Sequence, residues 1–150
     1  MRLTSDAFDD GDAIPERYGY RAANVNPPLA IESPPEGAET LALVVDDPDA
    51  VEPAGTVWDH WVVWNLPAER TEIPVGFDPV DAGGREGTND YGDVGYGGPN
   101  PPDREHTYRF VAYALDTTVD LGSGATKADV EAAIEGHVLA AARLTGTYAP

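Results

Sequence analysis

The sequence predicts a mainly β fold, a β-sandwich with one α-helix near the C-terminus, in a single domain that spans residues 1–150. Short apolar segments alternate with polar residues at the period of two that strands show, and loops rich in Gly and Pro separate them. One clear run of helical spacing follows residue 125. A chain of 150 residues with 41% hydrophobic content is long enough to bury one core.

The first half of the chain is organised around a buried strand that ends in carboxylates. Before residue 40, repeated prolines remove backbone donors, so we expect only short strands such as Arg2 to Thr4. The apolar, β-branched run from Leu41 to Val45 then predicts a buried strand. It stops abruptly at a polar turn, which consists of Asp46, Asp47, Pro48 and Asp49.

Residues 57–66, VWDHWVVWNL, predict the next strand. Strict alternation places Trp58, His60, Val62 and Trp64 on one face, and Asp59, Trp61 and Val63 on the other. Residues 69–78 predict a further strand, and Pro74 within it argues for an edge position. Residues 81–103 are too rich in Gly, Pro, Asn and Asp for regular structure, and we expect a functional loop there.

The second half contributes one more strand and the helix. Residues 107–116 alternate, so that one face carries Tyr108, Phe110, Ala112 and Ala114, with His106 at the same parity where the strand begins. Thr126, followed by Asp129, reads as a helix start. Helical spacing of apolar residues then continues to Leu144 and predicts a helix that Gly146 ends.

The charge of the chain narrows the classes of partner. There are 27 acidic residues against 9 basic ones, which gives a formal net charge of -18, and Lys127 is the only lysine. Salt screens such repulsion, because the Debye length falls from about 10 Å at 0.1 M to about 3 Å at 1 M. The excess of Asp and Glu therefore indicates adaptation to high salt, as in a protein from a halophile. The same charge argues against nucleic acid as a partner.

The absence of cysteine, of a signal sequence and of a long apolar run predicts the compartment and limits the redox chemistry. No cysteine is present, so disulfides, cysteine metal sites and cysteine nucleophiles are excluded. The N-terminal residues MRLTSDAFDDGDAIP do not resemble a secretory signal, and no apolar run is long enough to span a membrane. We therefore expect a cytoplasmic protein without integral membrane association.

Three polar features together suggest a small pocket. They are the Asp47 and Asp49 turn at a strand end, His60 within the next strand, and the pair His106 and Tyr108. Each has an ordinary structural explanation: an Asx turn, a hydrogen-bonded core histidine and a buried tyrosine. The glycine-rich loop before His106 could add backbone N–H groups that bind an anion.

The sequence resembles a known family at several motifs. DPDA at 47–50, HWVVWNLP at 60–67, GYGGPNPP at 95–102 and HTYRFVAYALD at 106–116 are similar, in this order and spacing, to the phosphatidylethanolamine-binding protein family. The closer likeness is to its short bacterial and archaeal branch of Raf kinase inhibitor-like proteins. The C-terminal GATKADVEAAIEGHVLAAARLTGTY also resembles that branch, so the likeness covers nearly the whole chain.

The resemblance implies two antiparallel sheets and a pocket for phosphate-like or carboxylate anions. The family's pocket positions fall on Asp47, Asp49, His60, Gly97, Pro99, His106 and Tyr108. The chain departs from the family pattern in two motifs. Val51 replaces a proline, and Arg104 and Thr107 stand where the pattern has a glycine and an arginine. The missing arginine would have supplied a fixed cation and a bidentate donor.

The leading hypothesis from the sequence is a non-catalytic protein that binds a small anion, or the phosphorylated or carboxylate group of a partner, without a cofactor. A metal-free hydrolase or isomerase that uses His60 and Asp47 is the alternative, although no nucleophile motif is present. A metal-dependent enzyme is less favoured, because no closely spaced ligand motif occurs. A regulatory role toward a kinase rests on the family resemblance alone, and so does a homodimer.

Overall fold

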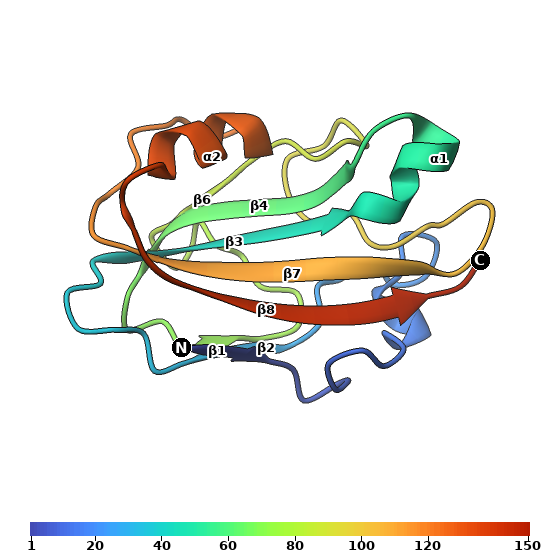
Figure 1. Ribbon diagram of the computed structural model, residues 1–150, viewed down its shortest axis with the longest axis horizontal. Coiled ribbons are helices and arrows are strands. Elements are labelled where there is room, and N and C mark those ends of the chain that lie inside the picture. The colour runs from blue at the N-terminus through green and yellow to red at the C-terminus, as the bar shows by residue number, and fades with distance from the viewer.

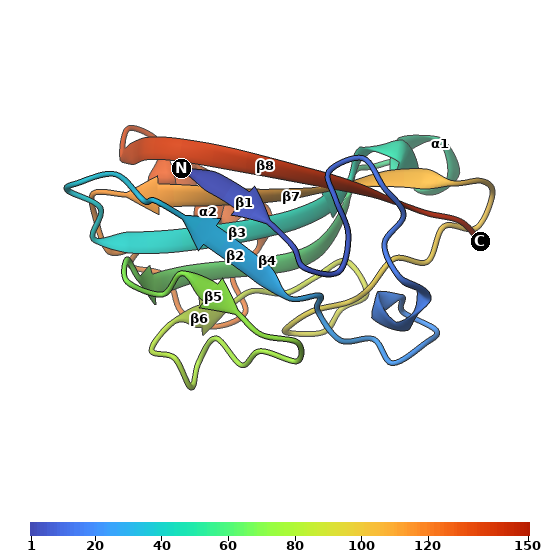
Figure 2. The same cartoon turned by 90° about the horizontal axis from the view of Figure 1, so that it is seen from below.

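The computed structural model describes residues 1–150 and has the predicted mainly β fold, with two antiparallel sheets and few helices. The larger sheet contains, in spatial order, β6 (Arg85–Glu86), β4 (Trp58–Pro67), β3 (Thr40–Asp47), β7 (His106–Leu115) and β8 (Val138–Tyr148). The smaller sheet contains β1 (Arg2–Thr4), β2 (Leu29–Glu32) and β5 (Glu72–Ile73). The smaller sheet lies against one face of the larger one (Figures 1 and 2).

Strand β3 lies at the centre of the larger sheet, and the burial that its apolar sequence predicts is confirmed. It pairs with β4 on one side and with β7 on the other, and all eight of its residues are buried. Leu41, Leu43 and Val45 point into the core between the two sheets, where Ile31 and Phe110 also lie. The residues of alternate parity point to the other face, where Ala42 joins a second, smaller apolar cluster.

The predicted alternation of β7 is confirmed. His106, Tyr108 and Phe110 are each 1% exposed and share one face, whereas Thr107 between them is exposed. The pattern is decisive here because one face of β7 packs against the core and the other does not. The short strand Arg2–Thr4 is also confirmed. The strand predicted over residues 69–78 has the expected edge position, but it is reduced to the two residues of β5 and excludes Pro74.

The predicted C-terminal helix is correct at its start and wrong at its end. α2 (Lys127–Ile134) begins with a capping box, in which Thr126 and Asp129 each bond the other's backbone N–H. It stops at Glu135, and Gly136 follows with φ at +82°. The remaining residues form β8, which pairs with β7 along its length. Pairing with β7 satisfies the backbone there and outweighs the helical spacing of the alanine-rich sequence.

A β-bulge in β4 corrects the predicted faces of that strand. The register pairs Val45 with Trp61 and Asp46 with Asp59, which leaves His60 as an extra residue. His60 therefore lies beside Tyr108, whereas Val62 packs in the small cluster beneath α2. Bulges re-aim single side chains in this way, and strict alternation cannot anticipate them.

An ion-pair network fastens α2 to the outer face of the larger sheet. Arg109 holds Asp46 through two bonds of 2.7 and 2.8 Å, and Lys127 bonds both Asp46 at 3.1 Å and Asp59 at 2.8 Å. Burial alone would raise the pKa of Asp46, but the bonds from Arg109 and Lys127 bring it below the ordinary value. The single lysine of the chain is thus a structural residue.

Three short helices complete the chain: η1 (Glu16–Tyr18), η2 (Pro48–Ala50) and α1 (Val51–Ala54). The last two follow directly from the end of β3 and lie at one end of the larger sheet (Figure 1). The expected loop at residues 81–103 contains only the two-residue strand β6. None of the helices is long and apolar enough to span a membrane.

Candidate functional site

A pocket of about 430 Å³ opens where β3 ends and where β4 and β7 begin. Antiparallel pairing brings these three positions to the same end of the sheet. The wall combines acidic, imidazole and aromatic side chains with α1 and with the proline-rich loop before β7. Its members are Tyr20, Asp47, Ala50, Pro53, Ala54, Trp58, His60, Tyr91, Asn100, Pro101, Pro102, His106 and Tyr108.

Asp47 joins the turn after β3 to the pocket. Its Oδ1 accepts the backbone N–H of Asp49 at 2.9 Å, which is the Asx turn that DPD predicts. Its Oδ2 accepts a hydrogen bond from Nδ1 of His106 at 2.6 Å. Asp47 is 3% exposed, so both carboxylate oxygens are bonded inside the protein. Asp47 therefore both forms the Asx turn and lines the pocket.

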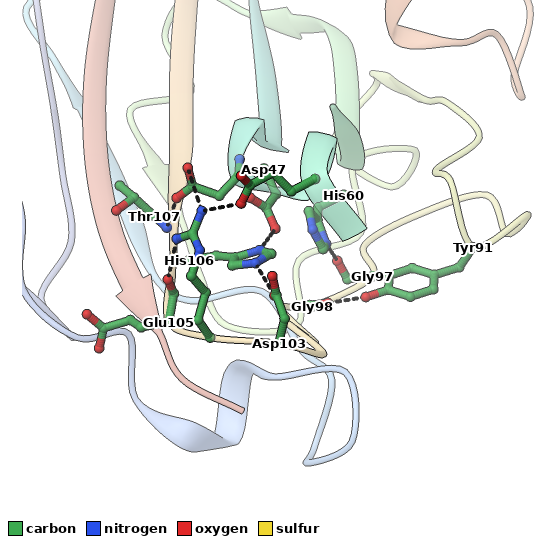
Figure 3. Close-up of polar contacts among 12 residues, drawn as sticks. Asp47, His60, Tyr91, Gly97, Gly98, Asp103, Glu105, His106 and Thr107 are labelled. Atoms are coloured by element: carbon green, nitrogen blue, oxygen red, sulfur yellow. Dashed lines mark hydrogen bonds and ion pairs between the residues drawn. The ribbon is translucent and has the colours of Figure 1, made fainter. Parts of the chain in front are cut away.

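His106 is held as an imidazolium between two carboxylates. Its Nδ1 donates to Asp47, and its Nε2 donates to Oδ1 of Asp103 at 2.7 Å (Figure 3). Carboxylates only accept, so both ring nitrogens carry hydrogen. Burial would lower the pKa of His106, but the bonds to Asp47 and Asp103 raise it above the ordinary value. The ring is fixed and charged, and both of its donors are in use.

His60 has the opposite protonation state. Its Nδ1 donates to the carbonyl oxygen of Gly97 at 2.6 Å (Figure 3), which leaves the lone pair on Nε2. Burial lowers the pKa of His60, because the side chain is almost completely enclosed. Nε2 is buried and has no hydrogen-bond partner. His60 is therefore a neutral imidazole with one unsatisfied acceptor at the pocket.

Two further polar atoms of the pocket residues lack partners. They are Nε1 of Trp58 and the hydroxyl of Tyr108, and both are buried. The rings of His60 and Tyr108 meet edge to face at 5.2 Å, and the rings of His106 and Tyr108 lie 6.3 Å apart. Burial, with the charge of Asp47, raises the pKa of Tyr108, so its hydroxyl stays protonated. An unsatisfied buried polar group costs about 1–3 kcal/mol unless a bound molecule bonds to it.

The other predicted site residues support the wall without being part of it. Gly97 positions His60 through its carbonyl and donates its own N–H to the His60 carbonyl at 2.9 Å. A Cβ on Gly97 would lie 2.4 Å from the Tyr91 ring, so a larger residue does not fit. The carboxylate of Asp49 accepts the backbone N–H of Thr107 at 2.9 Å, which ties the turn after β3 to the start of β7. Pro99 lines a neighbouring hollow instead.

Sequence reasoning missed the residues that close the pocket. Tyr20 and Tyr91 stack at 3.9 Å, and Trp58 meets Tyr91 edge to face at 5.5 Å. Trp58 shares the parity of His60 in the sequence, and that signal could have identified it. Tyr20 of the wall comes from an irregular segment, and so does Asp103, which bonds His106 without being part of the wall; no periodicity indicates a direction in such segments.

The positions where the chain departs from the family pattern lie outside the pocket wall. Thr107 is exposed on the opposite parity of β7, and Val51 is 50% exposed at the start of α1. Arg104 lies 3.8 Å from Asp49 and 3.6 Å from Glu52, so its guanidinium is directed to the acidic surface of η2 and α1. No three His, Asp or Glu side chains are grouped as metal ligands would be.

Comparison with known proteins gives a consistent assignment. The family model described as phosphatidylethanolamine-binding protein matches residues 4–149. The UPF0098 protein of Methanothermobacter thermautotrophicus is 45% identical over 154 residues, which cover 99% of this chain and 98% of that one. The UPF0098 protein of Chlamydia muridarum is 41% identical, with the same coverage of each chain.

Solved structures show the same fold. A phosphatidylethanolamine-binding protein homologue from Chlamydia trachomatis superposes with a TM-score of 0.91 at 38% identity, covering 98% of this chain and 95% of that one. E. coli YbcL, described as a member of the mammalian family, superposes with a TM-score of 0.89 at 32% identity, covering 98% and 96%. The chain therefore belongs to the phosphatidylethanolamine-binding protein family.

Proposed function

We propose that the protein binds one small anionic group, of the phosphate, phosphomonoester or carboxylate type, in the pocket at the ends of β3, β4 and β7, and that it does so without turnover. One observation carries the proposal. Three buried polar atoms of the pocket residues have no partner, namely Nε1 of Trp58, Nε2 of His60 and the hydroxyl of Tyr108. Buried polar groups are nearly always hydrogen-bonded, so a bound molecule is the expected partner.

The chemistry of these atoms suits an oxyanion. The Trp58 N–H only donates, and the Tyr108 hydroxyl can donate. His60 becomes a third donor when a proton is added to Nε2, and an adjacent anion favours that protonation. Hydrogen bonds to a charged group contribute about 1.5–3 kcal/mol each.

The organic part of the ligand would contact an aromatic and proline-rich rim. Tyr20, Tyr91 and Pro53 lie on the wall, together with Pro101 and Pro102 of the loop before β7. Pockets of about 300–1,000 Å³ with few polar groups are typical sites for small molecules. A phosphomonoester or carboxylate with a small apolar substituent therefore matches the pocket better than a bare ion.

The wall also favours binding over catalysis. No Ser, Thr or Lys lines the pocket. Burial raises the pKa of Tyr91 and of Tyr108, which disfavours their use as nucleophiles at neutral pH. Both nitrogens of His106 already donate to carboxylates, so this ring is not free to act as a base.

Calorimetric titration at constant molar KCl tests the proposal with inorganic phosphate, glycerol 3-phosphate and acetate. Trp58→Phe and Tyr108→Phe each remove one donor and should weaken binding by about 1–3 kcal/mol. Tyr113→Phe is the matched control, because Tyr113 lies on β7 at the opposite parity, outside this pocket. A phosphoserine peptide, run alongside, distinguishes a partner's side chain from a free small molecule. If none of these anions binds, or if the three variants bind alike, the proposal fails.

A further inference from the structure

Asp103 occupies a bond that an anion in the pocket would be expected to make. It lies on the loop that precedes β7, three residues before His106, and its Oδ1 accepts Nε2–H of that ring at 2.7 Å. The His106 side chain is 1% exposed and lines the pocket, whereas the Asp103 side chain is 38% exposed. Figure 3 shows the two carboxylates, Asp47 and Asp103, on either side of the ring.

The two carboxylates are not equally fixed. Asp47 is 3% exposed, and its other oxygen holds the N–H of Asp49, so its displacement would break the turn after β3. Asp103 has one side-chain partner, which is His106, and its backbone partners, Arg104 and Asp103 itself, belong to its own exposed loop, so the solvent can hydrate its carboxylate when the bond to His106 opens. Of the two acceptors, Asp103 is therefore the one that can leave.

Charge leads to the same conclusion. One imidazolium between two carboxylates leaves a net charge of -1 on this group, in a chain whose formal net charge is -18. A further anion placed beside it would be repelled, because like charges in contact cost several kcal/mol. An anion that takes the place of the Asp103 carboxylate leaves the local charge balance unchanged and accepts the same N–H.

On the basis of the proposed function, we propose that Asp103 is an internal competitor, a carboxylate of the chain itself that holds Nε2–H of His106 and must move aside when an anion binds. The tether is short, so the carboxylate is present at a high effective concentration. The Asp103 carboxylate lowers the affinity of the pocket for every anion. Only an anion that outcompetes a carboxylate at His106 therefore stays bound. The rings of His60 and His106 both lie next to Tyr108, with centroid distances of 5.2 and 6.3 Å.

Titration of four proteins with inorganic phosphate at constant molar KCl tests this inference. They are the wild type, Asp103→Ala, Asp103→Asn and the matched control Glu105→Gln. The alanine variant removes the competing acceptor and should bind phosphate about tenfold tighter or more. The asparagine variant keeps an acceptor but not the charge, so its affinity for phosphate should lie between those of the wild type and Asp103→Ala. Glu105 is exposed on the same loop and has no side-chain bond to His106, so its variant should stay within about twofold of the wild type.

The outcomes separate this inference from the proposed function. If phosphate binds the wild type and Asp103→Ala equally, or binds the variant more weakly, the competitor role is overturned and the pocket assignment stands. If Glu105→Gln gains as much as Asp103→Ala, the gain comes from net charge alone and the role is again overturned. If no protein of the four binds phosphate, the competitor role is overturned, and the proposed function then depends on the titrations with glycerol 3-phosphate and acetate. Melting temperatures in the same buffer verify folding, and the asparagine variant keeps the test decisive if the alanine variant unfolds.

Discussion

Lowering the pH from about 8 to about 6 should strengthen sulfate binding through the uptake of one proton by His60. Sulfate is the suitable ligand, because its own charge does not change in this range. In the free protein, burial lowers the pKa of His60, so the ring is neutral at pH 7. The bound anion raises that pKa again, and affinity therefore rises as the pH falls toward the free-state value.

We expect this effect to involve one proton. The bonds to Asp47 and Asp103 raise the pKa of His106 in the free protein, and an anion that replaces Asp103 keeps that pKa raised, so His106 contributes little to the slope. The raised pKa values of Tyr91 and Tyr108 keep both hydroxyls neutral. Affinity should therefore change by up to about tenfold per pH unit, which is about 1.4 kcal/mol, and not by a hundredfold.

Calorimetric titration at several pH values, each in two buffers of different ionisation enthalpy, counts the protons directly. His60→Gln should bind more weakly and lose the pH slope, because glutamine does not titrate in this range. His137→Gln is the matched control, since His137 is the exposed histidine bonded to Asp116. An affinity that does not depend on pH, or a slope that survives in His60→Gln, would refute the assignment of His60 as the titrating donor.

Three other predictions concern stability and packing. The melting temperature should rise steadily from about 0.1 M to molar KCl as salt screens the net charge of -18, and a flat thermal unfolding profile would contradict adaptation to salt. Gly97→Val should abolish anion binding while the fold remains, because its side chain would clash with Tyr91; Gly122→Val, with open space around it, should bind normally in the same titration. Lys127→Met should lower the free energy of unfolding in urea by about 1–3 kcal/mol, because Asp59 loses its cation and Asp46 keeps only Arg109. Arg2→Met at an exposed pair should change it by less than about 1 kcal/mol.

Acid should weaken the ion pairs of Asp46 with Arg109 and Lys127, and the lowered pKa of Asp46 determines the pH range of this loss. The pKa of Asp46 is lowered in the folded protein despite its burial, because Arg109 and Lys127 bond its carboxylate. The stabilisation is therefore fully present above the unfolded-state pKa of about 3.9 and is lost as the pH falls through the folded-state value. Urea unfolding between about pH 5 and pH 2 measures this loss, and Asp46→Asn should flatten the profile. An unchanged profile in that variant would contradict the assignment.

The sequence predicted the fold best where burial on one face leaves a single possible register. The alternation from His106 to Ala114 succeeded for that reason, whereas the burial of Leu41 to Val45 was predicted from its continuous apolar run. It failed in β8, where Ala140, Ala142 and Leu144 fit a period of two as well as a helical one. Alanine intrinsically favours a helix, and the pairing partner that overrides this preference is far away in the chain.

The candidate site, too, was predicted from the sequence only in part. Asp47, His60, His106 and Tyr108 were named from motifs, and they line one pocket. The protonation states were not predictable, because they depend on contacts such as the carbonyl of Gly97 and not on residue type. Asp103 was missed because nothing in its local sequence shows that an irregular loop turns its carboxylate back to a histidine. Tertiary contacts, more than motifs, set the chemistry of this pocket.

Lys127 gives the molecule a useful experimental property. Apart from the N-terminus, the chain has a single amine, and that amine is 15% exposed and bonded to Asp46 and Asp59. An acylating reagent can therefore modify one internal site, and its reaction there requires the bonds of Lys127 to Asp46 and Asp59 to open. The rate at which the peptide that contains Lys127 gains the mass of one acyl group then measures how often this contact opens in the native protein. The scarcity of lysine, a feature of composition, thus makes the dynamics of one defined contact directly measurable.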